Sequence, residues 1–164
     1  SGDLIISEIM HDPASVSDYR GEWFEIYNPT NNPVNLNGLI VTGVGSESFT
    51  VSGSNLISAN GYFVFGTRSN TSQNGGATID YVYSRSELKL DRGDIISLEL
   101  SDGTLFDDVL YHTSLGFSAG VGASMSLSIL DADDNDTGSN WCDASSSMSG
   151  GDLGTPGEAN DSCN

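Results

Sequence analysis

The chain has 164 residues, of which 37% are hydrophobic, and a formal net charge of −18 from 23 acidic and 5 basic side chains. This length suits a single domain with its own hydrophobic core, so we expect residues 1–164 to form one domain. The charge argues against direct nucleic-acid binding, because that affinity comes from basic side chains that displace counterions. No segment approaches the run of about 18 apolar residues that crosses a bilayer.

Many short apolar runs separated by turn residues predict an all-β protein with almost no helix. The strands that we expect lie, in chain order, at residues 3–12, 22–28, 34–43, 48–53, 62–66 and 79–84, in a hairpin over 93–112, and at 124–130. About eight or nine short strands at regular spacing are typical of a β-sandwich.

The hairpin and the last strand carry the most specific local signals. Asp102-Gly103 separates two alternating runs, which predicts a type I′ turn. In the run 124–130, serines alternate with Met125, Leu127 and Ile129, so these three apolar side chains are expected to share one face.

Two glutamates interrupt the strand of the segment "GEWFEIYNP". Successive strand residues point to opposite faces, so Glu22 shares a face with Phe24 and Ile26 while Glu25 lies on the other. Glu22 and Glu25 therefore cannot form a carboxylate pair with each other while the strand is regular.

Glu8 offers a better partner, because the same alternation places it on one face with Leu4, Ile6 and Met10. A carboxylate on an apolar face needs a counter-charge, hydrogen bonds or a proton. If the first two strands are neighbours, an acidic cluster can form from Glu8, Asp12, Glu22 and Glu25. The functional interpretation is a calcium site. The structural one, which we favour, is a glutamate that caps loop N–H groups or pairs with Arg20.

A second acidic segment is "DADDNDTGSNW". Asp131, Asp133 and Asn135 have the spacing that opens an EF-hand loop, but Asp136 and Cys142 stand where glycine and glutamate are required. A looser calcium site could still use Asp131, Asp133, Asp134 and Asp136. The simpler interpretation is a solvated loop of Asx turns, which needs no metal.

The two cysteines, Cys142 and Cys163, lie in the irregular C-terminal part of the chain. A disulfide between them would close a loop worth about 3 kcal/mol. The alternative is one buried thiol and one free thiol near the chain end. We expect the disulfide, because a cysteine next to the final residue has little packing role of its own. A disulfide would indicate an exported protein, and we expect the chain to be part of a longer secreted one.

Catalytic motifs are weak. The histidines, His11 and His112, lack a third soft ligand for zinc if the cysteines are paired, and neither a G-x-S-x-G nor an H-E-x-x-H motif occurs. We therefore expect no enzyme. The alternative hypothesis is a metal-dependent hydrolase that uses the acidic cluster of Glu8, Glu22 and Glu25.

Several segments, taken in order, resemble the lamin tail domain family in its bacterial form: "LIISEIMHDP", "EWFEIYNPTNNPVNLNGLIVTG", "ISANGYFVF", "GDIISLELSDGTLFDDVLY" and "NWCDASSSMSGGDLGTPGEAND". The resemblance extends from about Asp3 to Asp161. The most specific parts are E-W-x-E-[IL]-Y-N-P and, later in the chain, G-T-P-G-x-x-N. The resemblance implies an immunoglobulin-like β-sandwich and no catalytic residue.

What the resemblance implies about function is an accessory module of a secreted or surface-attached bacterial protein, often beside a nuclease or another hydrolase domain. The partners that we expect are neighbouring domains of the parent protein or a surface ligand, and the location is extracellular or at the cell surface. Together with the acidic composition, this favours a non-catalytic interaction module that positions a larger protein. Calcium is the one cofactor that the acidic segments suggest.

Overall fold

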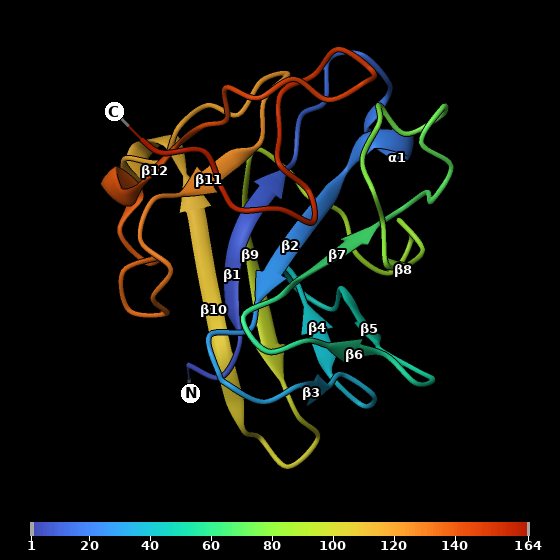
Figure 1. The fold of residues 1–164 in the computed structure, drawn as a ribbon, viewed down its shortest axis with the longest axis vertical. Helices are drawn as coiled ribbons and strands as arrows, with labels where there is room; N and C mark the ends of the chain where they lie inside the picture. The colour runs from blue at the N-terminus through green and yellow to red at the C-terminus, as the bar shows by residue number, and fades with distance from the viewer. Residues whose placement is uncertain (1, 164) are drawn as a thin grey trace.

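Two β-sheets face each other in the computed structural model, which describes residues 2–163 (Figure 1). The six-stranded sheet has the order β12-β11-β1-β2-β7-β8, and the four-stranded sheet has the order β10-β9-β4-β5. The strands are β1 (Ile5–Met10), β2 (Trp23–Tyr27), β3 (Val34–Asn35), β4 (Ile40–Thr42), β5 (Ser48–Thr50), β6 (Leu56–Ile57), β7 (Tyr62–Gly66), β8 (Tyr81–Val82), β9 (Gly93–Glu99), β10 (Leu105–His112), β11 (Met125–Leu127) and β12 (Trp141–Asp143).

The predicted fold class is confirmed. Helix within the described residues is limited to α1 (Asp18–Gly21) and to two 3₁₀ turns, η1 (Thr113–Leu115) and η2 (Gly138–Asn140). Residues 2–163 form twelve strands rather than eight or nine, because several strands are only two or three residues long. The run 34–43, for example, divides into β3 and β4 at a turn where Gly38 has a φ of +87°. No helix among residues 2–163 is long and apolar enough to span a membrane.

The hairpin of β9 and β10 is present, but its predicted turn type is wrong. A type I′ turn needs positive φ at both central residues, and of the pair Asp102-Gly103 only Gly103 has one, at +86°. The backbone N–H of Gly103 donates to the carbonyl of Leu100, and that of Leu100 donates to Thr104. The connection is therefore longer by one residue than a two-residue turn.

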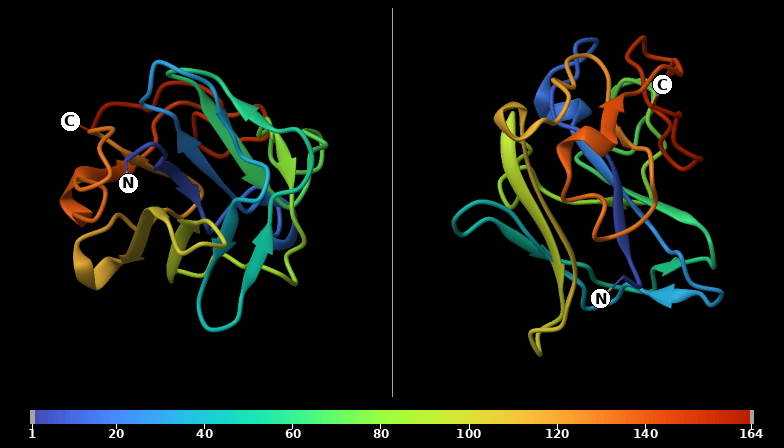
Figure 2. Two further views of the ribbon diagram at one scale, coloured as in Figure 1. Left: turned by 90° about the horizontal axis from the view of Figure 1, so that it is seen from below. Right: turned by 90° about the vertical axis from the view of Figure 1, so that its left-hand side faces the viewer.

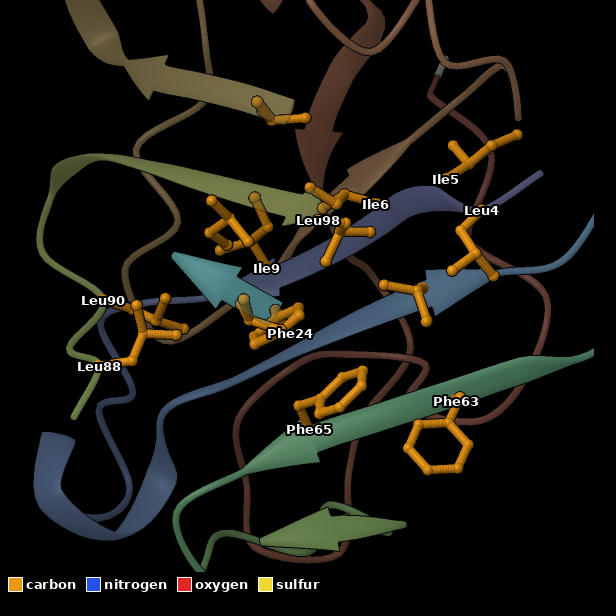
Figure 3. Packing of buried hydrophobic residues seen from close by; sticks show 14 of the residues in the cluster. Leu4, Ile5, Ile6, Ile9, Phe24, Phe63, Phe65, Leu88, Leu90 and Leu98 are labelled. Carbon is orange, nitrogen blue, oxygen red and sulfur yellow. The ribbon is translucent and has the colours of Figure 1, made fainter. Parts of the chain in front are cut away.

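The main core lies between the two sheets and contains most of the buried apolar side chains (Figure 3). Ile6 and Ile9 of β1 and Phe24 of β2 lie on the side that faces Leu98 of β9, and all four are fully buried. Ile129, which was expected to share a face with Met125 and Leu127, is half exposed and lies beyond β11, which ends at Leu127.

A β-bulge in β1 changes which residues share a face. Ile6 pairs with Ile26 and Glu8 pairs with Glu25, so Ser7 is an extra residue in the ladder between β1 and β2. Ile6 and Ile9 consequently both point into the core, whereas simple alternation puts Ile6 on one face with Glu8. The prediction that Leu4, Ile6, Glu8 and Met10 share a face is wrong for this reason.

The outer face of the six-stranded sheet is covered by the end of the chain, residues 144–163, which we name the C-terminal strap. Met148 of the strap packs in a small second apolar cluster with Met10 of β1, Trp23 of β2 and Val64 of β7. The strap and the β9–β10 hairpin lie on opposite sides of β1 and β2 (Figure 2). One face of this sheet is thus covered by the second sheet and the other by the strap.

Candidate functional site: the buried carboxylates under the strap

Glu8 and Glu25 form a carboxyl pair on the outer face of the six-stranded sheet. They lie directly opposite each other in the pairing of β1 with β2, and both residues are 0% exposed. The bulge at Ser7 is what places Glu8 on this face. The expected proximity of Glu8 to one of the two glutamates of "GEWFEIYNP" is therefore present, with Glu25 as the partner.

Glu8 is held by groups of the strap and of the residues around β11. Its Oε1 accepts from the backbone N–H of Thr155 at 2.8 Å and from the hydroxyl of Ser124. Its Oε2 accepts from the Thr155 hydroxyl at 2.9 Å. These neutral donors replace the water that a carboxylate loses on burial.

Glu25 is held in the same manner. Its Oε1 accepts from the hydroxyl of Ser7 at 2.7 Å, and its Oε2 accepts from the backbone N–H of Gly157 at 2.7 Å. Gly157 has a φ of +87°, a conformation that side-chain-bearing residues rarely adopt. A glycine at this position lets the strap turn while it presents its N–H to Glu25.

Three residues of the strap motif "GTPGEAN" thus have a physical role. Thr155 binds Glu8, Gly157 binds Glu25, and the Asn160 amide donates to the carbonyl of Ser7 at 2.7 Å and to that of Leu127 at 3.0 Å. Asn160 therefore satisfies a carbonyl at the bulge itself. The "EWFE" segment and the "GTPGEAN" segment, more than a hundred residues apart, are in direct contact.

Burial favours the protonated form of both carboxyl groups. It raises the pKa of Glu8 above the ordinary glutamate value. The pKa of Glu25 is raised well above that value, first by burial and then by the neighbouring Glu8, and the hydrogen bonds from Ser7 and Gly157 only partly oppose the effect. Since two adjacent buried carboxyl groups resist simultaneous ionisation, the pair retains a proton more readily than isolated glutamates do.

Glu22 is separate from this pair and has a counter-charge. The Arg85 guanidinium contacts it through Nη2 at 2.8 Å and Nε at 3.1 Å, and the backbone N–H of Leu90 donates to it at 3.3 Å. Burial raises the pKa of Glu22, while Arg85 acts in the opposite direction. The proposed alternative partner, Arg20, is not the one found. Arg85 comes from the segment after β8, and no pattern near Glu22 indicated it.

Asp12 does not join the pair either. It forms an ion pair with Arg92, whose Nη2 lies 2.6 Å from its Oδ2. The cluster of Glu8, Asp12, Glu22 and Glu25 is therefore divided among three places: Glu8 with Glu25, Glu22 with Arg85, and Asp12 with Arg92. Over residues 2–163, His, Cys, Asp and Glu side chains are nowhere gathered in threes as ligands for a metal ion.

The acidic loop contains backbone turns of the expected Asx kind. The Oδ1 of Asp131 accepts from the backbone N–H of Asp133 at 2.9 Å. The backbone carbonyl of Asp131 accepts from the backbone N–H of Asn135 at 3.1 Å. Asp131, Asp133 and Asp136 line an open pocket of about 410 Å³. The carbonyl of Asp134 instead accepts from the Asn140 amide at 2.9 Å, inside the loop.

Asp107 is an ionisable residue that the sequence analysis missed. It is 5% exposed and accepts from the backbone N–H of Ile6 and from the Asn135 amide, both at 2.7 Å, so it joins β10 to β1 and to the acidic loop. Burial raises its pKa to about 7. Alternation along β10 contained a signal, because it places Asp107 on the same face as the buried Val109 and Tyr111.

Cys142 and Cys163 form a disulfide with Cα atoms 5.6 Å apart, which confirms the predicted pairing. Cys142 lies in β12 and Cys163 near the end of the strap. The bond therefore attaches the far end of the strap to the edge of the sheet that the strap covers.

The family profile described as Lamin Tail Domain matches residues 1–113. The chain belongs to the lamin tail domain family. The match ends just after β10, so β11, β12 and the strap lie beyond it. No curated protein matches the chain. Lamin tail domains are immunoglobulin-like, and membership indicates a non-catalytic interaction module.

Proposed function

We propose that this lamin tail domain is a non-catalytic accessory module that positions a larger exported bacterial protein on a partner or surface. One observation carries the proposal: the side chains that could act as catalytic acids are already bound by other groups of the protein. Glu8 and Glu25 are sealed under the strap, and Glu22 is bound to Arg85. A general acid or base must reach its substrate, and these three side chains are occupied by protein groups. The disulfide supports an oxidising location outside the cell.

We further propose that residues 1–164 act as one unit within the parent protein, because β11 and β12 pair into the same sheet as β1. Its partners would be neighbouring domains of that protein or a surface ligand. The net charge of −18 favours partners with basic surfaces and disfavours DNA and RNA.

The decisive experiment compares the parent protein with and without this domain. We expect deletion to leave turnover of a small soluble substrate unchanged and to abolish retention of the protein on its surface or partner. Loss of turnover with retention intact would contradict the proposal.

The competing hypothesis is a metal-dependent hydrolase that uses Glu8, Glu22 and Glu25. It is tested by incubating the isolated domain with a phosphodiester and with Mg²⁺, Mn²⁺, Ca²⁺ or Zn²⁺. Hydrolysis that disappears in Glu8→Gln but persists in Glu158→Gln, an exposed strap residue, would establish the enzyme and overturn the accessory module.

Calcium stabilisation stays a proposal, with the loop of Asp131, Asp133, Asp134 and Asp136 as the site. Because these carboxylates are not gathered as metal ligands in the structure, the loop would have to close around the ion. Carboxylate and carbonyl oxygens are the ligands that Ca²⁺ prefers. Calorimetric titration of metal-free protein should give a binding heat that Asp133→Asn removes and that Asp102→Asn, in the exposed β9–β10 turn, leaves unchanged. Absence of heat at millimolar calcium would exclude this part.

A further inference from the structure

The strap is attached at both ends, so its middle part can open like a lid while its ends stay on the sheet. Its near end continues directly from β12, and its far end is fixed to β12 by the disulfide between Cys142 and Cys163. Residues between these two ends can therefore lift from the sheet only as a closed loop. Such a loop remains beside its binding surface, so that closure is intramolecular and reversible.

Within residues 154–160 of the strap, the contacts that close the lid are concentrated on the two buried carboxyl groups. Residues 148–153 are attached separately, because Asp152 accepts from the backbone N–H groups of Ala14 and Ser15 and Leu153 is hydrogen-bonded to the backbone of Gly122 and Ser124. Thr155 and Gly157 donate their backbone N–H groups to Glu8 and Glu25, at 2.8 and 2.7 Å. Asn160 adds one more attachment by donating to the carbonyl of Ser7, while Asp161 holds the strap together internally by accepting from the backbone N–H groups of Ser145 and Ser146. Opening the middle of the strap would return Glu8 and Glu25 to water.

The ionisable groups that surround the pair from the neighbouring elements favour a bound proton. Glu25 is affected by Glu8 of β1 and by Asp80, which precedes β8, and both are acidic. Burial, followed by the neighbouring Glu25 and Glu8, raises the pKa of Tyr62 of β7 to about 12, so Tyr62 is neutral at physiological pH. On the strap, the Asp161 carboxylate is directed to Ser145 and Ser146, and Glu158 is exposed.

We propose that the strap is a pH-dependent lid, closed most firmly when Glu8 and Glu25 hold a proton between them and loosened as the pH rises. The sign follows from linkage. The closed state binds the proton more tightly than the open state, in which both glutamates are hydrated and titrate near their ordinary value. Closure is therefore most favourable in acid and weakens between that ordinary pKa and the raised pKa of the closed state.

Opening of residues 154–160 would uncover the edge of the Trp23 ring against which Gly154 packs, and opening that extends to Met148 would also uncover Met10 and Val64. The device thus couples the protonation of one carboxyl pair to the exposure of an apolar surface on the outer face of the six-stranded sheet. This inference does not depend on the proposed function and holds for the isolated domain.

The test is amide hydrogen exchange of the oxidised full chain between pH 5 and 9, corrected for the base-catalysed intrinsic rate. We expect protection at Thr155 and Gly157 to fall by up to about tenfold per pH unit over part of this range, the dependence of a single linked proton. Protection at Phe24 and Ile26 in the core should not follow it. In Glu25→Gln, which is isosteric with the protonated acid, strap protection should depend less on pH than in the wild type, because only Glu8 still titrates, while the exposed control Glu158→Gln should retain the wild-type slope.

Strap protection that is independent of pH in the wild type, or an equal slope in Glu25→Gln, would overturn the proposal. If Glu25→Gln does not fold, carboxyl ¹³C titration of the wild-type protein decides. A carboxyl of this pair that remains protonated to neutral pH supports the lid, and two carboxyls that both titrate at the ordinary glutamate value contradict it.

Discussion

The two faces of the six-stranded sheet are buried in different ways. The inner face, with Ile6, Ile9 and Phe24, is buried by the second sheet mainly through apolar contacts. The outer face places Glu8 and Glu25 beside Met10 and Trp23 and buries them all under a strap with little regular secondary structure. The first face is stabilised by the removal of apolar area from water. The second also depends on matching the buried carboxyl oxygens with hydrogen-bond donors.

This difference has consequences for specificity. Apolar contacts tolerate exchanges of similar volume, whereas a buried carboxyl group fixes which backbone N–H must lie where. The irregular strap is accordingly attached through particular residues, Thr155, Gly157 and Asn160. Each of the following changes tests one side of this comparison.

The largest effect is expected on the inner face. Phe24→Ala should lower the free energy of unfolding by about 3–5 kcal/mol, because it removes a fully buried ring that stacks on Phe65 with centroids 4.9 Å apart. Chemical denaturation measures the loss. Leu110→Ala, at an exposed position of β10, is the control and should stay within about 0.5 kcal/mol. Equal losses in the two variants would contradict the placement of the core.

The covalent attachment of the strap comes next. Replacing both Cys142 and Cys163 by serine should cost about 3 kcal/mol, since the unfolded chain loses the constraint of the closed loop. Denaturation of the variant should match that of the reduced wild-type protein. A variant as stable as the oxidised wild type would show that the strap is held by its non-covalent contacts alone.

The two glutamates of "EWFE" should respond in opposite directions. Glu22→Gln leaves Arg85 without its carboxylate and should cost about 1–3 kcal/mol at pH 7.5. Glu25→Gln removes a group whose raised pKa makes its ionisation unfavourable in the folded state, so stability at pH 7.5 should be unchanged or higher. Unfolding curves of both variants at pH 5 and 7.5 give the comparison. A large loss in Glu25→Gln at pH 7.5 would show that the ionised carboxylate is the stabilising form.

The smallest effect belongs to a single hydroxyl of the strap. Thr155→Val retains the shape and the backbone N–H but deletes the donor to Glu8 Oε2, so we expect a loss of about 1 kcal/mol. Thr104→Val, at an exposed position in the β9–β10 connection, should have almost no effect. Similar losses in the two variants would indicate that the hydroxyl bond does not contribute to strap closure.

Much of the fold could be predicted from local patterns. Alternation located β2, β7 and the β9–β10 hairpin, and it correctly separated Glu22 from Glu25, because these strands are regular and have one face in the core. The position of the second cysteine indicated the disulfide. These features depend on residues close in sequence or on a pair with few alternatives.

The candidate site was less accessible, because it depends on contacts between distant segments. Arg85 reaches Glu22 across 63 positions, and Thr155 reaches Glu8 across 147. Nothing in the neighbourhood of either glutamate specifies such a partner. The bulge at Ser7 was missed as well, since an extra strand residue is visible only once the pairing with β2 is known.

The bulge at Ser7 also has a consequence for comparing this domain with its relatives. Consider a homologue that lacks the inserted residue. If its β1 is aligned with this one without a gap, the assignment of residues to the inner or outer face will be correct on only one side of Ser7. Deleting Ser7 should leave Ile6 facing the core and Glu8 facing the strap, because the two residues would then follow each other in regular alternation opposite Ile26 and Glu25. The inserted residue therefore has to be located before the inward and outward positions of β1 are transferred between homologues.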